Sequence, residues 1–338
     1  MGHSFFISQE SSSYEIKALR RESPASRTLS CVMGEGSCLV KWKRALWRMA
    51  ERSVAYNGNM KRERSEMNME MIYKYPRTRH IEGSRIQAGD EDLKNVRFEE
   101  IRGKFVVLEE KVDGANCGVS FGENGKLMLQ SRGHFLNGGY GERQFDLFKT
   151  WASCHQADLY EMLGTRYVMY GEWLYAKHTV YYDRLTHYFM EFDIFDKETK
   201  CFLSTAARRK LLLQCPFIVS VLVLFEGRLD SLDELVSWLG RSHFKSERYE
   251  QSLREQCEEQ GLYWELVKRQ TDMSDLMEGI YIKAEDDGLV TDRFKYVRST
   301  FLNTILDSET HWLNRPVIPN QLAPGTDLFS DLPLREEV

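Results

Sequence analysis

The sequence lacks an apolar stretch long enough to cross a membrane, since even FIVSVLVLF at residues 217–225 ends after nine residues, whereas a helical span needs about 20. Its seven cysteines form no CxxC pair, which argues against a cysteine zinc site or a disulfide framework. The opening residues show no charged segment, apolar segment and cleavage site of a signal peptide. These absences predict a soluble cytoplasmic protein with reduced thiols and no membrane partner.

An excess of positive charge is also missing, because the net charge is −5. Any nucleic-acid binding must therefore rely on a local basic patch. Basic residues crowd residues 74–85 and recur at 208–210. These groups could follow a phosphate backbone, or they could be ordinary solvated charges. With 42% hydrophobic residues over 338 positions, the chain can bury a substantial core.

The pattern along the chain predicts three parts. Residues 1–70 are rich in serine and charge, and we interpret them as an N-terminal extension that is partly disordered. CLVKWKRALWRMAER at residues 38–52 is the exception, because its spacing predicts a basic amphipathic helix. Such a helix could touch RNA or a membrane surface, or could dock on its own domain. Residues 71–300 form the predicted main domain, and residues 301–338 form a C-terminal tail.

Within the main domain, short β-rich runs alternate with turn residues up to about residue 196. GENGK at 122–126 and EDDG at 285–288 are predicted hairpin turns. Apolar residues three and four apart over residues 197–277 predict a helical insert. Strands return in EGIYIKAEDDGLVTDRFKYVR, so the expected class is α+β.

LEEKVDGANCGVSF at residues 108–121 contains the first candidate for chemistry, Lys111. A KxDG match alone is weak, since chance alone supplies one in roughly a tenth of chains of this length. A lysine that attacks phosphorus must lose a proton held to a pKa of about 10.4. Arg293, Lys295 and a metal ion would supply the positive charge that lowers this pKa.

The other candidates lie on predicted strands or strand ends. Arg132 and Lys283 are cations that could stabilise a leaving pyrophosphate. Glu172 and Glu278 supply the hard oxygen ligands that a divalent metal prefers. Phe192 offers an aromatic face to a purine base. Each has a plain alternative: Lys111 as a solvated lysine, Glu172 in a surface ion pair and Phe192 as ordinary core.

Taken in order, EKVDGAN, SRG, YGEW, FDI, EGIYIK and RFKYVR resemble the motifs of the covalent nucleotidyltransferases. This superfamily comprises ATP-dependent ligases and mRNA capping enzymes. The KxDGxN pattern and the SRG element are most similar to RNA ligases related to the phage nick-sealing enzyme. KYPRTRHIEGSR at residues 74–85 resembles the opening segment of bacterial RNA ligase family proteins. The resemblance spans about residues 73–300 and implies two antiparallel sheets flanked by helices, with ATP between the sheets.

The resemblance also implies roles for individual residues. Lys111 would take AMP, Phe192 would stack on adenine, and Asn116 would lie near the RNA phosphates. The implied nucleotide-binding set is Glu110, Lys111, Gly114, Asn116, Arg132, Glu172, Phe192, Glu278, Lys283, Arg293 and Lys295. The implied catalytic set is Lys111, Asp113, Glu172, Glu278 and Lys295, with Glu172 and Glu278 as metal ligands for Mg²⁺ or Mn²⁺.

The chain departs from the pattern in three places. Arg293 stands where the family usually has a lysine, and a planar guanidinium does not simply replace an ammonium. The segment after residue 300 is too short for the oligonucleotide-binding barrel of DNA ligases and capping enzymes. The predicted insert at 197–277 is longer than the family would suggest.

These observations favour an ATP-dependent RNA ligase that joins an RNA 5′-phosphate to a 3′-hydroxyl through AMP on Lys111. Enzymes that heal RNA ends would be its possible partners in repair. A GTP-dependent guanylyltransferase of the capping type is the nearest alternative. A catalytically degenerate RNA-binding module is the alternative from another class.

Overall fold

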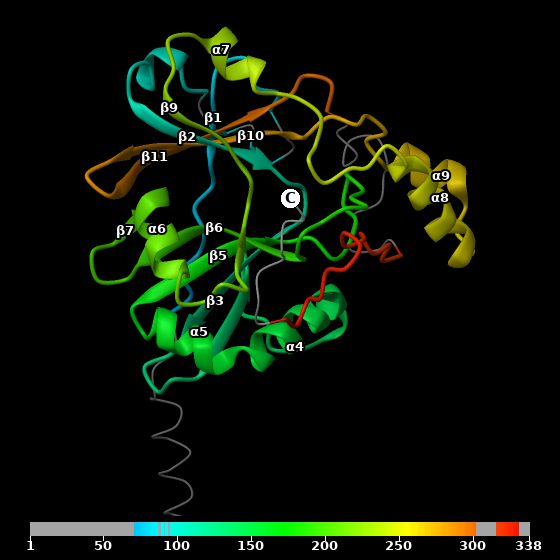
Figure 1. The fold of residues 1–338 in the computed structure, drawn as a ribbon, viewed down its shortest axis with the longest axis horizontal. Helices are drawn as coiled ribbons and strands as arrows, with labels where there is room; N and C mark the ends of the chain where they lie inside the picture. Colours follow the sequence, from blue (N-terminus) through cyan, green and yellow to red (C-terminus); the bar gives the residue numbers. More distant parts are fainter. Residues whose placement is uncertain (1–70, 87–88, 91, 94, 302–315, 331–338) are drawn as a thin grey trace, which may run out of the picture. The chain divides into compact units, whose positions relative to one another are not determined.

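One hydrogen-bonded path of strands runs through the part of the chain that the structure, a computed structural model, describes: residues 71–86, 89–90, 92–93, 95–301 and 316–330 (Figure 1). The strand order is β4-β3-β5-β6-β7-β11-β10-β2-β9, with β1 beside β11 and β8 beside β6. Only these last two pairs are parallel. The strands are β1 Arg79–His80, β2 Phe105–Lys111, β3 Ala115–Phe121, β4 Leu127–Ser131, β5 Tyr167–Trp173, β6 Phe189–Asp196, β7 Cys201–Leu203, β8 Val219–Ser220, β9 Val223–Arg228, β10 Gly279–Asp286 and β11 Leu289–Val297.

Helices cover the outer faces of this strand path (Figure 1). α4 and α5 pack against β3, β5 and β6, where Trp151 and Phe148 lie in the largest buried cluster. α7 and the 3₁₀ turn η1 pack against β2, β10 and β11 through Leu235 and Phe98. The helices are η1 Phe98–Glu100, η2 Tyr140–Phe145, α4 Asp146–Cys154, α5 Gln156–Leu163, α6 Thr205–Leu212, α7 Leu232–Ser237, α8 Tyr249–Glu259 and α9 Trp264–Arg269.

The prediction of two separate antiparallel sheets is not confirmed. The path folds into two halves, β4-β3-β5-β6 and β11-β10-β2-β9, but the short strand β7 joins them. Phe202 of β7 pairs with Phe195 on one side and with Val290 on the other. The predicted α+β class is confirmed, with one large and mainly antiparallel sheet in place of two. The inner faces of its two halves can form a site between them.

Alternation along the strands decides which side chains reach that inner face. On β2, Val106 and Leu108 enter the core beneath α7. Glu109 and Lys111, one residue out of phase, line a cavity between the halves. The predicted turns are confirmed, since residues 122–126 join β3 to β4 and residues 287–288 join β10 to β11.

The prediction of a helical insert over residues 197–277 is wrong in part. The segment contains α6, α7, α8 and α9, but it also contains β7, β8 and β9. β9 pairs along β2, with Phe225 opposite Leu108. The run FIVSVLVLF contains β8 and the first three residues of β9, since β-branched residues favour extended backbone. Part of the predicted insert therefore borders the strand that ends at Lys111.

Residues 316–330 pack on the same unit, Met71–Val338. Pro319 bridges to Ala176, and Leu322 bridges to Leu185. The predictions made for residues 1–70, an extension with a basic amphipathic helix, lie outside the described residues. No helix in the described ranges is both long and apolar enough to cross a membrane.

Candidate active site

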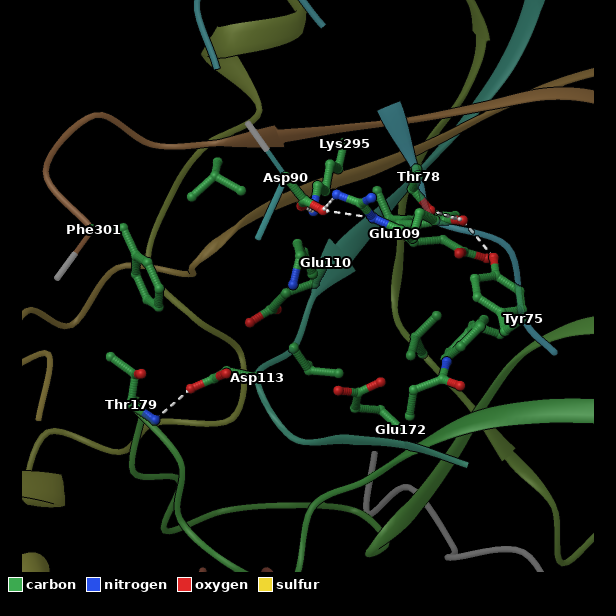
Figure 2. Close-up of a pocket in the computed structure, with 18 of the residues that line it drawn as sticks. Tyr75, Thr78, Asp90, Glu109, Glu110, Asp113, Glu172, Thr179, Lys295 and Phe301 are labelled. Atoms are coloured by element: carbon green, nitrogen blue, oxygen red, sulfur yellow. Dashed lines mark hydrogen bonds and ion pairs between the residues drawn. The ribbon is translucent and has the colours of Figure 1, made fainter. Parts of the chain in front are cut away.

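A cavity of about 390 Å³ lies between the inner faces of the two strand halves. Figure 2 shows Glu110 and Lys295 on one side of it, Glu172 on the other, and Asp113 near its base. The volume lies within the range of small-molecule sites. The predicted residues that line it are Glu110, Lys111, Asp113, Asn116, Arg132, Glu172, Phe192 and Lys295.

Lys111 is the last residue of β2, and its ammonium donates to Glu278 Oε2 at 2.8 Å. β10 begins directly after Glu278, and Gly279 pairs with Lys111 in register. Burial alone would lower the pKa of Lys111, but the carboxylates of Glu278 and Glu172 outweigh burial and raise it. Neighbouring cations were expected to lower the pKa of Lys111, but without bound ligands the neighbouring carboxylates raise it. Lys111 is therefore a protonated ammonium in this structure.

Asp113 and Gly114 fix the turn between β2 and β3. Asp113 Oδ2 accepts the backbone N–H of Thr179 at 2.6 Å (Figure 2) and that of Val180 at 2.8 Å. The Gly114 N–H donates to Glu172 Oε1 at 3.1 Å. A Cβ on Gly114 would lie 2.6 Å from the Trp173 carbonyl oxygen, so glycine is required. Asp113 therefore holds the chain that surrounds Lys111.

Glu172 and Glu278 are the two predicted metal ligands. Burial raises the pKa of Glu172 to about 7, although Lys111 and Arg132 oppose the shift. Burial also raises the pKa of Glu278. Both pKa values are raised because the nearby cations do not fully compensate for burial of the two carboxylates. A divalent cation would supply the additional positive charge. No cluster of three His, Cys, Asp or Glu residues forms a metal site within the described ranges, so an ion here would also need oxygens from phosphates or water.

The remaining lining residues suit a nucleotide. Phe192, on β6, faces the cavity and meets the ring of Tyr75 edge to face, with centroids 5.2 Å apart. Arg132 is exposed at the cavity wall. Asn116 Oδ1 is buried and has no hydrogen-bond partner among the described residues. A bound ribose hydroxyl or metal-held water could donate to it, since buried polar atoms are rarely left unpaired.

Lys295 lies on β11 and forms an ion pair with Asp90 (Figure 2). Asp90 also accepts from Arg77 and contacts His80. Burial lowers the pKa of Lys295, and the nearby Lys111 lowers it further. Asp90 is not among the predicted site residues, because it lies between residues 74–85 and the motif that contains Lys111. Arg77 belongs to residues 74–85, whose basic side chains were expected to follow a phosphate backbone or to be solvated, and the structure places it at the cavity.

Glu110 lies beside Lys111 on β2 but points its carboxylate to another segment. Its oxygens accept from Ser242 Oγ at 2.6 Å and from His243 Nδ1 at 2.8 Å. Glu110 is buried, and both partners belong to residues 238–248, between α7 and α8. The structure thus gives Glu110 a visible role in anchoring that loop next to the cavity.

Four predicted residues do not line the main cavity: Gly114 and Glu278, which contact lining residues, and Lys283 and Arg293, which lie apart from it. Lys283 is fully buried and pairs with Glu109 at 2.9 Å and Asp193 at 3.1 Å. The guanidinium of Arg293 lies over the Phe202 ring, 3.7 Å from its centroid. Lys283 was expected to face pyrophosphate, but in this structure two acidic side chains neutralise it behind the cavity wall.

A buried arginine completes this network, and the prediction for it was wrong: Arg208, one of the basic residues 208–210 expected to follow a phosphate backbone or to be solvated, is buried. Arg208, on α6, contacts Glu191 at 2.8 Å and Glu109 at 2.8 Å. Arg208 and both carboxylates are buried. The sequence places Arg208 in an apparently amphipathic helix, and nothing local marks it as the partner of a glutamate 99 positions away.

The sequence model of the RNA ligase family matches residues 104–297, more than half of the chain. The chain belongs to the RNA ligase family. The match begins just before β2 and ends with β11, so it contains Lys111, Glu172, Glu278 and Lys295. No curated protein matches this RNA ligase family member.

Solved structures of a Naegleria gruberi RNA ligase are similar to this family member at low identity. A variant with ATP and Mn is 16% identical with a TM-score of 0.39, and the match covers 62% of this chain and 53% of that one. An apo variant is 17% identical with a TM-score of 0.41 and the same coverage. The structure with pyrophosphate is 16% identical with a TM-score of 0.38, covering 62% and 54%. The chain thus spans about half the length of these proteins.

Proposed function

We propose that the protein is an ATP-dependent RNA ligase that works through AMP bound covalently to Lys111. The position of Lys111 carries the proposal. Its Nζ lies at a cavity of about 390 Å³ whose wall also presents Arg77, Arg132 and Lys295. A polyphosphate needs several cations near the phosphorus that is attacked. Membership of the RNA ligase family supports the same reaction.

In the first step, Lys111 Nζ would attack the α-phosphorus of ATP. A nitrogen–phosphorus bond forms, the bond from the α-phosphorus to the bridging oxygen breaks, and pyrophosphate leaves with that electron pair. Lys111 must first give up a proton, and Glu278 is the hydrogen-bonded acceptor already in contact with it. Lys295 and Arg132 would face the charge that develops on the phosphates.

A divalent cation, when bound, would offset the phosphate charge and polarise the phosphorus centre. Glu172 is the carboxylate at the cavity wall that could hold it. Glu278 could be a second ligand once the proton that it takes from Lys111 has passed to water. The orphaned Oδ1 of Asn116 adds a further oxygen on the same wall. Phe192 provides the aromatic face for adenine.

The later steps use RNA as the second substrate. The AMP phosphate would move from Lys111 to an RNA 5′-phosphate, which releases the lysine and forms a phosphoanhydride. The 3′-hydroxyl of RNA would then attack the 5′-phosphorus, form the phosphodiester and displace AMP. RNA with a 5′-phosphate and a 3′-hydroxyl is therefore the proposed substrate.

The test is covalent labelling with ATP that carries a label on its α-phosphate, in the presence of Mg²⁺ or Mn²⁺. Wild type, Lys111→Ala and Lys104→Ala would be denatured and examined for label on the polypeptide. Lys104 is a matched control because it is an exposed lysine just before the same strand. Label on wild type and Lys104→Ala, with none on Lys111→Ala, is the expected result.

Labelling by GTP in preference to ATP would replace the ligase proposal with a capping-type reaction. Absence of label from a folded sample free of pre-bound AMP would refute the covalent step. RNA binding that persisted under those conditions would favour a binding module. Measuring RNA joining by the same three proteins would then separate nucleotide transfer from sealing.

A further inference from the structure

A second hollow of about 150 Å³ adjoins the main cavity. Arg77 lines both spaces, so they meet at this side chain. The other residues of the second hollow come from β1, β7 and β11. They are Arg79, Phe202, Val290, Thr291, Asp292 and Arg293.

The charged residues that line this hollow are mostly basic. Three arginines line it, against a single aspartate. Arg79 contacts that aspartate, Asp292, at 2.7 Å. Arg77 is turned toward Asp90 and Asp92, which lie outside the hollow's lining. Each guanidinium thus has an acidic neighbour, since Arg293 lies 3.6 Å from Asp193. Three guanidinium groups around so small a space still offer more N–H donors than these carboxylates use, which suits one bound anion.

Arg293 is held in place by more than charge. Its guanidinium lies 3.7 Å from the centroid of the Phe202 ring and 5.0 Å from that of Tyr75. Its buried Nη1 makes no hydrogen bond within the described residues, and Asp193 Oδ2 is 3.6 Å away. A planar guanidinium fixed by ring stacking is well suited to bind phosphate oxygens.

We propose that the hollow bounded by Arg77, Arg79 and Arg293 is a phosphate-binding subsite beside the nucleotide cavity. This inference deepens the proposed function and rests on it for the identity of the ligands. Two substrates of that reaction carry phosphate groups, the polyphosphate end of ATP and the backbone of RNA. Both use the same chemistry, and the test distinguishes them.

Arg79 is the residue to change, because its side chain is 40% exposed and its ion pair with Asp292 is at the surface. Removing an exposed ion pair of this kind changes stability little, so the variant should fold. Arg102→Ala is the matched control. Arg102 also pairs with a carboxylate, Glu99, and lies over an aromatic ring, that of Phe98, but lines neither cavity.

The experiment measures equilibrium binding of ATP and, separately, of a 5′-phosphorylated RNA oligonucleotide. All proteins carry Lys111→Ala, so no covalent step contributes. A hydrogen bond to a charged group is worth about 1.5–3 kcal/mol, which corresponds to roughly tenfold or more in affinity. Arg79→Ala should therefore weaken one ligand about tenfold, Arg79→Lys should recover part of the loss, and Arg102→Ala should change neither.

Weaker ATP binding assigns the subsite to the polyphosphate, and weaker RNA binding assigns it to the RNA backbone. If the subsite binds RNA, Arg79→Ala should reduce RNA affinity by a larger factor at low salt than at high salt. Unchanged binding of both ligands by Arg79→Ala would overturn the inference. The binding assay needs no catalysis, so it can succeed even if the labelling experiment fails. Loss of binding in Arg79→Ala, in a protein whose Lys111 form takes up no labelled AMP, would support the subsite and refute the proposed covalent step.

Discussion

Replacing Glu172 by glutamine should stabilise the protein at alkaline pH while it removes a residue of the proposed reaction. Burial raises the pKa of Glu172 from 4.5 to about 7. The folded protein therefore keeps a proton on this carboxyl group over a pH range in which the unfolded chain has lost it. Glutamine has the same shape, remains neutral, and can still accept the Gly114 N–H at its carbonyl oxygen.

The direction follows from proton linkage. Between pH 4.5 and about 7 the folded state binds more protons than the unfolded state, so stability falls as pH rises through this window. The difference between 4.5 and about 7 corresponds to about 3 kcal/mol above pH 7, at about 1.4 kcal/mol per unit of pKa. Glu172→Gln removes this loss, because glutamine does not ionise.

The assay is denaturant unfolding of wild type and Glu172→Gln at pH 5 and pH 8, read from Cm at constant m. The variant should be more stable by about 1 kcal/mol or less at pH 5 and by up to about 3 kcal/mol at pH 8. Glu161→Gln, on the exposed face of α5, is the control and should follow wild type at both pH values. The reasoning is refuted if Glu172→Gln shows the same difference at both pH values, or is less stable at pH 8.

Three further changes test the packing and charges around the site. Gly114→Ala places a Cβ 2.6 Å from a backbone oxygen, so it should cost about 1–3 kcal/mol and abolish labelling by ATP; wild-type stability would contradict the clash. Arg208→Ala removes the cation that pairs with buried Glu191, while Glu109 keeps Lys283, and should cost about 3–5 kcal/mol. The exposed Arg102→Ala should cost at most about 1 kcal/mol, and similar values for the two variants in denaturant unfolding would show that burial of the ion pair does not matter. Asp90→Asn releases Lys295 from its ion pair and should tighten ATP binding measured by titration; weaker binding would show that Asp90 assists the ligand.

The strands that carry the site could be predicted because their signals are local. Turn residues at GENGK and EDDG fix two hairpins. Alternation along β2 puts Lys111 on the face of the strand that points away from its core residues Val106 and Leu108. The ordered motifs also placed Glu172, Phe192 and Lys295 at one cavity, because each lies on a strand whose register the fold then fixes.

What the sequence could not reveal depends on contacts between distant segments. Periodicity alone does not distinguish a strand from a helix in a short apolar run, so the pattern predicts a helical insert over the residues that form β9. Lys283 is turned away from the cavity because Glu109 and Asp193 neutralise it. Arg208 meets its partners only after α6 packs over β6, and no local pattern encodes that contact.

The most direct test of the central claim is to locate AMP on the chain after incubation with ATP and a divalent cation. Mass spectrometry of the denatured, digested protein would identify the modified side chain. The account predicts a single AMP on Lys111. Adding pyrophosphate to the folded protein before denaturation should remove this AMP. AMP on another residue, or none on a folded protein that nevertheless joins RNA, would contradict it.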